Sequence, residues 1–243
     1  MATKAALIIG AGDDTGGAIA KAFAREGFVA CVVRRARHID KLHDLVNSIQ
    51  AEGYEARAYG VDARDEDEMV ALVEEIERDV GPIGVAVFNI GANVRFSITD
   101  TTAQVYRKVW EMAAFAGFLT GREAAKRMVP RGEGTIIFTG ATASLRGGVN
   151  YSAFAGAKFA LRALAQSMAR ELGPKNIHVA HVIIDGAIDS NFIRENVGDV
   201  DAKREAQAIL APDEIGRTYV MLHNQHRSAW THELDLRPWS ESW

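Results

Sequence analysis

The sequence predicts an α/β fold, with one doubly wound parallel sheet of about seven strands and helices on both faces. Apolar runs alternate with helical patterns almost from end to end, and the joins between them are short. Most of these runs are continuously apolar, which is typical of parallel strands that are buried on both faces. Alternation of strands and helices also favours right-handed crossovers within one layered sheet.

Seven strands and six helices are expected along the chain. The expected strands are Ala5–Gly10, Phe28–Arg34, Glu55–Val61, Gly84–Ile90, Gly134–Thr139, Ile177–Ile184 and Glu233–Leu236. The expected helices are Gly16–Glu26, Ile39–Ala51, Glu66–Val80, Thr102–Met128, Tyr151–Leu172 and Pro212–Asn224. The polar stretch Asn191–Leu210 breaks the alternation. Two interpretations of it are open, a mobile flap over the site or a surface excursion.

Length and composition limit the classes of function. The chain of 243 residues is 48% apolar and 25% charged, so residues 1–243 are expected to form one globular domain. The net charge of -4 argues against a nucleic-acid partner. No apolar stretch is long enough to span a membrane, and Ala5–Ile9 is too short for a signal peptide, so a cytoplasmic protein is expected. No cysteine–carboxylate cluster accompanies His223, His226 and His232, and no metal site is expected.

A glycine-rich loop at residues 10–17, GAGDDTGG, lies between the first expected strand and the first helix. Glycines in this position let the backbone approach a pyrophosphate at a helix N-terminus. Gly10, Asp13, Thr15 and Gly16 are therefore expected among the contacts to a dinucleotide. The alternative is an ordinary glycine-rich turn in which Asp13 or Asp14 caps the helix.

The end of the second expected strand favours NADP(H) over NAD(H). Folds that prefer NAD place an acid there, where it accepts a hydrogen bond from the ribose 2′-hydroxyl. This chain has Arg34 and Arg35 instead, and guanidinium groups suit a 2′-phosphate. A solvated basic turn is the alternative interpretation.

These motifs resemble those of the short-chain dehydrogenase/reductase superfamily, and the resemblance covers essentially the whole chain. Gly10 and Gly16 match two glycines of the family's Gly-x-x-x-Gly-x-Gly loop, whereas Asp14 replaces the middle one. The resemblance implies a Rossmann-type fold. It also implies further cofactor contacts after the third, fourth and sixth strands, at Asp62, Ala63, Asn89, Gly91, Gly186 and Ile188.

Most of the family's catalytic residues are replaced in this chain. The family uses a tyrosine as proton donor, a lysine four residues later that holds the nicotinamide ribose, a serine and an asparagine. Lys158 matches the lysine, but Phe154 occupies the tyrosine position. The serine position is Ala141, and the asparagine position falls at Ala113 or Ala114. The usual proton transfer cannot run through Phe154, because its ring has no acidic proton.

Tyr151 offers another route to the same chemistry. Enoyl reductases of the superfamily pair a tyrosine with a lysine seven residues later, and Tyr151 and Lys158 have that spacing. Seven residues are nearly two helical turns, so both side chains are expected on one face of a helix. Tyr151 is then the expected proton donor, and Thr142 is expected to supply a second hydroxyl. The alternative is a tyrosine that only packs at the helix start.

The sequence thus predicts an NADP(H)-dependent oxidoreductase that reduces a carbonyl or an enone, with Tyr151, Lys158 and Thr142 as catalytic residues. The alternative is a nucleotide-binding protein of the same fold without redox turnover, with a sensor or interaction role. The retained Lys158 favours the enzyme, and the missing serine, tyrosine and asparagine favour the alternative.

The expected partners are a small molecule and further copies of the chain. Apolar pocket candidates indicate a partly apolar substrate, and they are Val94, Phe96, Phe192 and Ile193. The long helices expected at 102–128 and 151–172 predict a homodimer or homotetramer, because such helices pack across a two-fold axis in this family.

Overall fold

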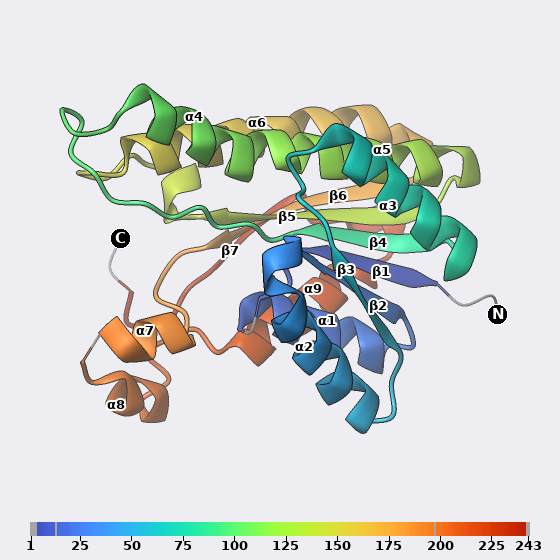
Figure 1. Cartoon of the computed structure of the whole chain (residues 1–243), viewed down its shortest axis with the longest axis horizontal. Coiled ribbons are helices and arrows are strands. Elements are labelled where there is room, and N and C mark those ends of the chain that lie inside the picture. Colours follow the sequence, from blue (N-terminus) through green and yellow to red (C-terminus); the bar gives the residue numbers. More distant parts are fainter. Residues whose placement is uncertain (1–3, 13, 197, 242–243) are drawn as a thin grey trace.

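The computed structural model of the chain describes residues 4–12, 14–196 and 198–241. Seven strands form one parallel sheet in the order β3-β2-β1-β4-β5-β6-β7 (Figure 1), which confirms the predicted fold class. They are β1 (Ala5–Ile9), β2 (Val29–Arg34), β3 (Ala56–Gly60), β4 (Ile83–Phe88), β5 (Gly134–Ala141), β6 (Ile177–Ile184) and β7 (Glu233–Leu236). The strand order reverses between β1 and β4, and doubly wound folds bind ligands at the carboxyl ends of the strands beside such a reversal.

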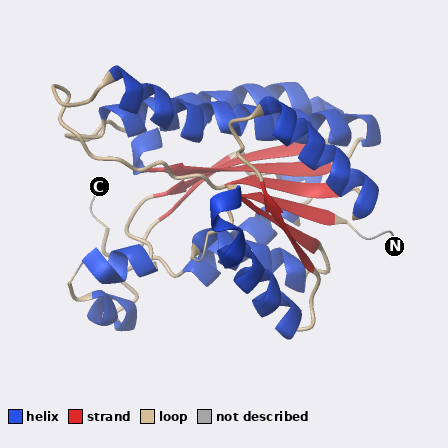
Figure 2. Cartoon of the chain, in the orientation of Figure 1, coloured by secondary structure: helices blue, strands red, loops and turns tan. Residues whose placement is uncertain are grey.

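Both faces of the sheet are covered by helices, which is why its strands are continuously apolar. In β1, Leu7 and Ile9 enter one core cluster, whereas Ala6 and Ile8 enter the other. The first face is covered by α3 (Glu66–Asp79), α5 (Ala116–Arg131) and α6 (Ser152–Leu172), and the second by α1 (Thr15–Arg25), α2 (Ile39–Ala51) and α9 (Pro212–His223) (Figure 2). In the described part of the chain, no helix is both long and apolar enough to cross a membrane.

The helix expected over Thr102–Met128 is instead two helices joined by a π-helical turn. α4 (Ala103–Trp110) leads into the π-helical turn Glu111–Phe115, and α5 then continues to Arg131. The extra residue of a π turn shifts the helical register, and such turns are frequent at functional sites. Here the turn contains Ala113 and Ala114, the positions that correspond to the family's asparagine.

The polar stretch 191–210 contains two short helices, α7 (Asn191–Asn196) and α8 (Val200–Glu205). Both lie beyond the edge of the sheet at which the strands end (Figure 1). Ile188 and Leu210 form a parallel bridge at the base of the stretch. The stretch therefore begins and ends at one point beside the carboxyl ends of the strands. This position is compatible with both expected interpretations, a flap over the site and a surface excursion.

Candidate active site

The glycine-rich loop is held against the end of β4. Gly10 has a φ of +84°, and a Cβ there would lie 2.8 Å from the carbonyl oxygen of Asn89. The Nδ2 atom of Asn89 donates a hydrogen bond of 3.2 Å to the carbonyl oxygen of Gly10. A Cβ on Gly16 would meet that same oxygen at 2.4 Å. Only glycine fits at these two positions, as the dinucleotide loop requires; Asp13 lies outside the described residues.

Two adjoining cavities follow the carboxyl ends of the strands. The smaller cavity has a volume of about 260 Å³ and lies at the ends of β1 to β4. Seven predicted cofactor residues line it, namely Gly10, Arg34, Arg35, Asp62, Ala63, Asn89 and Gly91. His38 and Arg64 also line it, although no sequence motif singled them out. The basic composition of residues 34–38 could have indicated that His38 lines the smaller cavity.

The outer end of the smaller cavity is positively charged. Burial lowers the pKa of His38, and the nearby guanidinium groups of Arg34 and Arg37 lower it further. Burial likewise lowers the pKa of Arg35, and Arg37 adds to the effect. Burial first and neighbouring guanidinium groups second disfavour the charged forms of both groups, and a multiply charged anion bound beside them would offset that repulsion.

Asp62 in the wall of the smaller cavity is paired mainly with Arg64. Arg64 donates two hydrogen bonds to its carboxylate, of 2.9 and 2.5 Å, and this pairing is the largest of the influences that lower the pKa of Asp62. Asp62 also attracts Arg35, and this attraction opposes the lowering of the pKa of Arg35 by burial and lowers the pKa of Asp62.

The larger cavity has a volume of about 570 Å³ and lies at the ends of β4 to β6. It shares Asn89, Ile90 and Gly91 with the smaller cavity. The other predicted residues that line it are Thr15, Thr142, Tyr151, Lys158, Gly186 and Ile188. The two cavities therefore form one elongated site with a basic end and a lysine–tyrosine end, which suits an extended dinucleotide.

The apolar wall of the larger cavity differs from the prediction. Phe154, Ile184 and Ile188 line it, whereas Val94 packs with the residues between α4 and α6. Phe96 and Ile193 do not line either cavity, and the side chain of Phe192 lies outside the described residues. The wall is partly apolar as expected, but these apolar groups come from α6, from β6 and from the segment that follows β6.

Lys158 is the buried amine of the larger cavity. Its Nζ atom donates hydrogen bonds to the carbonyl oxygens of Ile90, at 3.0 Å, and of Thr139, at 2.8 Å. The side chain is only 2% exposed, and burial lowers its pKa to about 7. Within the described residues no carboxylate forms an ion pair with it. Two carbonyl groups thus hold the amine where it can donate its third hydrogen to a ligand.

Tyr151 lies at the start of α6 rather than inside it. It is the residue before Ser152, and its φ and ψ of -113° and 20° are not helical. The shared helical face expected for Tyr151 and Lys158 is therefore not formed, although both side chains line the larger cavity. The guanidinium group of Arg95 lies 5.8 Å from the centre of the Tyr151 ring. The Tyr151 hydroxyl makes no hydrogen bond within the described part of the chain, so it is available to a ligand.

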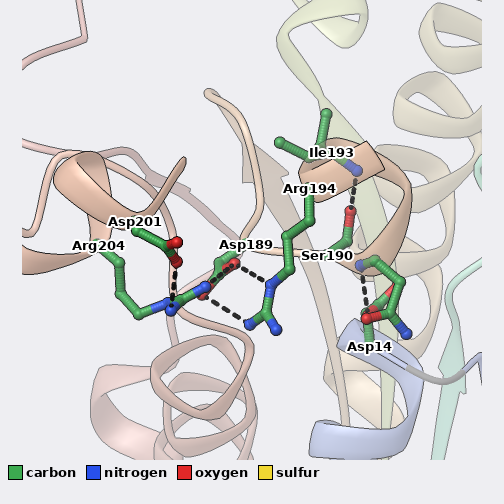
Figure 3. Close-up of polar contacts among 8 residues, drawn as sticks. Asp14, Asp189, Ser190, Ile193, Arg194, Asp201 and Arg204 are labelled. Atoms are coloured by element: carbon green, nitrogen blue, oxygen red, sulfur yellow. Dashed lines mark hydrogen bonds and ion pairs between the residues drawn. The ribbon is translucent and has the colours of Figure 1, made fainter. Parts of the chain in front are cut away.

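Asp14 links the glycine-rich loop to α7. It precedes α1, but its side chain does not cap that helix, so the capping interpretation is wrong for this residue. Its Oδ1 atom instead accepts a hydrogen bond of 3.1 Å from the backbone N–H of Asn191 (Figure 3). The carboxylate that replaces the family's middle glycine is thus directed at α7.

Asp189 holds the same segment together through two arginines. It accepts hydrogen bonds from Arg204, at 2.6 and 3.2 Å, and from Arg194, at 2.9 and 3.2 Å (Figure 3). These hydrogen bonds, with Arg204 first, keep the pKa of Asp189 well below its usual range. The ion pairs tie α7 and α8 to the segment that follows β6. No sequence motif indicated them.

Comparison with known proteins agrees with this architecture. Residues 4–200 match the family model described as short chain dehydrogenase. The chain is 47% identical to a short-chain dehydrogenase from Rhodopseudomonas palustris, whose crystal structure matches with a TM-score of 0.83 over 97% of this chain and 99% of that one. It is 29% identical, over 88% of its length and 82% of the relative's, to a 2-dehydro-3-deoxy-D-gluconate 5-dehydrogenase of Pseudoalteromonas atlantica.

A more distant structure shares the fold alone. It is an alcohol dehydrogenase from the archaeon Thermococcus sibiricus complexed with 5-hydroxy-NADP, at 22% identity and a TM-score of 0.86 over 99% of this chain and 98% of that one. The family match over most of the chain, together with the seven-stranded sheet and the retained buried lysine, shows that the chain belongs to the short-chain dehydrogenase family of oxidoreductases.

Proposed function

We propose that the protein is an NADP(H)-dependent oxidoreductase that reduces the carbonyl group of a small ketone or aldehyde, or an enone. The observation that carries the proposal is the elongated site, with Arg34 and Arg35 at one end and Lys158 and Tyr151 at the other. NADPH bound along it supplies the hydride. The relative from P. atlantica, a 2-dehydro-3-deoxy-D-gluconate 5-dehydrogenase, supports a small carbonyl-containing substrate.

In this proposal the residues of the larger cavity have separate roles in cofactor binding and proton transfer. Lys158 donates its remaining hydrogen bond to the nicotinamide ribose, because its buried amine is already fixed by two carbonyl groups. Tyr151 gives its hydroxyl proton to the oxygen of the substrate as that oxygen becomes negative. The backbone at Asn89, Gly91 and Ile188 positions the nicotinamide ring.

A nucleotide-binding protein without redox turnover is the competing function, and the absence of the family's tyrosine and serine motivates it. Measuring NADPH oxidation with a broad panel of enones, ketones and aldehydes separates the two. We expect consumption with at least one member. No consumption with any of them, combined with tight NADPH binding, would support the competing function.

The arginines at the end of β2 are expected to set the cofactor preference. The Arg34→Ala/Arg35→Ala variant should bind NADPH about 30- to 1000-fold more weakly, because two lost charge-assisted hydrogen bonds at roughly 1–2 kcal/mol each amount to about 2–4 kcal/mol. NADH affinity should stay nearly constant, since NADH has no 2′-phosphate. Calorimetric titration with both cofactors measures this. Equal affinities of the parent protein for NADPH and NADH would contradict the preference.

Exposed aromatic side chains on α4, α5 and α6 support a homodimer or homotetramer. Tyr106, Trp110, Phe118 and Phe159 are between 38% and 44% exposed, and a second copy of the chain would remove them from water. Light scattering at micromolar concentration is expected to give a mass of at least twice the 26.4 kDa of one chain. A mass near 26.4 kDa would contradict the prediction.

A further inference from the structure

Three neighbouring strands, β5, β6 and β7, end in register and place three polar residues in a row beside the larger cavity. Ala141 of β5 pairs with Ile184 of β6, and Ile184 pairs with Leu236 of β7. The next residue of each strand's chain is Thr142, Asp185 and Arg237 respectively. Register alone therefore brings a hydroxyl, a carboxylate and a guanidinium side by side.

The hydrogen-bond direction within this row is fixed. The hydroxyl of Thr142 donates to Oδ1 of Asp185 at 2.5 Å. Oδ2 of the same carboxylate lies 3.3 Å from Nη2 of Arg237, and Oδ1 lies 3.8 Å from Nη2 of Arg146. Asp185 is only 1% exposed. A carboxylate accepts but never donates, and Thr142 is the donor in this hydrogen bond, so its single proton is committed to Asp185.

Thr142 lines the larger cavity, whereas Asp185 lies behind it and does not. With its proton committed, the Thr142 oxygen has only lone pairs left to present to a ligand. It cannot donate to the reacting carbonyl oxygen, so the second hydroxyl donor expected there is not provided. The Thr142 oxygen can accept a hydrogen bond from a hydroxyl group of a ligand, and within the described residues it accepts none.

We propose that Thr142 is a specificity-determining residue that recognises a hydroxyl group on the substrate, and that Asp185 positions it by holding its proton. The substrate class is then a hydroxylated carbonyl compound, such as a 2-hydroxy ketone, rather than a simple ketone. This inference rests on the proposed function, because the reacting carbonyl is the one that Tyr151 protonates.

The test compares 2-hydroxyacetophenone with acetophenone, which lacks only the hydroxyl group. The parent protein is expected to prefer the hydroxy ketone by about 10- to 100-fold in kcat/KM with NADPH. This ratio is smaller than the largest ratios known for sites that bury a substrate hydroxyl, because Thr142 is only partly buried. Thr142→Ser should keep the preference, and Thr142→Val should reduce it to about one.

Asp185→Asn tests the direction of the hydrogen bond. An asparagine amide can donate to the Thr142 oxygen and release the hydroxyl proton, so the preference should fall to about one or invert. Asp235→Asn is the matched control, because Asp235 pairs with Arg237 on the same edge but does not contact Thr142. It should keep the preference for the hydroxy ketone. An unchanged preference in Asp185→Asn would overturn the positioning role.

Binding measured without turnover separates this inference from the proposed function. Calorimetry on protein saturated with NADP⁺, which cannot reduce a ketone, should show the same preference for 2-hydroxyacetophenone. A preference in binding with no NADPH oxidation would overturn the proposed function and keep the recognition site. Equal affinities, or no binding of either ketone, would overturn the inference whatever the turnover.

Discussion

Replacing Tyr151 with phenylalanine is expected to lower turnover by about 10²- to 10⁴-fold, the usual contribution of a positioned general acid. Affinity for NADPH should stay within about twofold, because the hydroxyl serves the substrate and not the cofactor. The Tyr151 ring packs 6.5 Å from that of Phe154, centre to centre, and a phenylalanine keeps that packing. Steady-state NADPH oxidation with the best substrate of the panel, beside calorimetric titration of NADPH, measures both quantities.

Phe154 allows a rescue experiment for the Tyr151→Phe variant. Its ring is 7% exposed and its centre lies 5.9 Å from Nζ of Lys158, so Phe154→Tyr places a hydroxyl at the family's usual position beside the lysine. In the Tyr151→Phe background, Phe154→Tyr should recover part of the lost turnover. Full activity of Tyr151→Phe alone would show that Tyr151 only packs at the start of α6.

The strands could be predicted to within a few residues because burial on both faces makes them continuously apolar. The error in the expected helix Thr102–Met128 has a physical origin, since the π turn at Glu111–Phe115 adds one residue to a helix without changing its composition. The observed helix also extends beyond the expected end at Met128, because α5 contains Pro130 and ends at Arg131.

The residues that line the two cavities could be predicted because motifs place them directly after strands, and parallel strands end at one edge. The hydrogen bond of Asp14 and the ion pairs of Asp189 could not be predicted from the sequence. The bond from Asn191 to Asp14 joins residues 177 positions apart, and it depends on where α7 packs. The hydrogen bond from Thr142 to Asp185 could not be predicted for a related reason, because the two residues are neighbours only through the pairing register of β5 and β6.

Replacing Lys158 with methionine is expected to abolish most of the turnover and yet stabilise the protein at neutral pH. The buried amine has a pKa of about 7 in the folded chain, lowered by burial from an ordinary value of 10.5. Methionine fills similar space without a charge, but it leaves the carbonyl oxygens of Ile90 and Thr139 without this donor. The net gain should therefore be about 1–3 kcal/mol at pH 7. NADPH affinity should fall as well, because the ribose loses its donor.

The pH dependence of the free energy of unfolding shows whether the buried amine causes the difference in stability between the parent and Lys158→Met. Below pH 7 both the folded and the unfolded chain carry the proton on Lys158, so the full cost of burying the charge opposes folding. Between pH 7 and about 10.5 the unfolded chain keeps a proton that the folded chain releases, and the free energy of unfolding should rise by up to about 1.4 kcal/mol per pH unit. Lys158→Met lacks this rise, so its advantage over the parent should shrink as the pH increases. Urea unfolding at pH 7, 8 and 9 measures the difference, with the exposed Lys203→Met as the control that should show no such trend. A stability difference that stays constant across this range would mean that the buried amine is not the group that titrates.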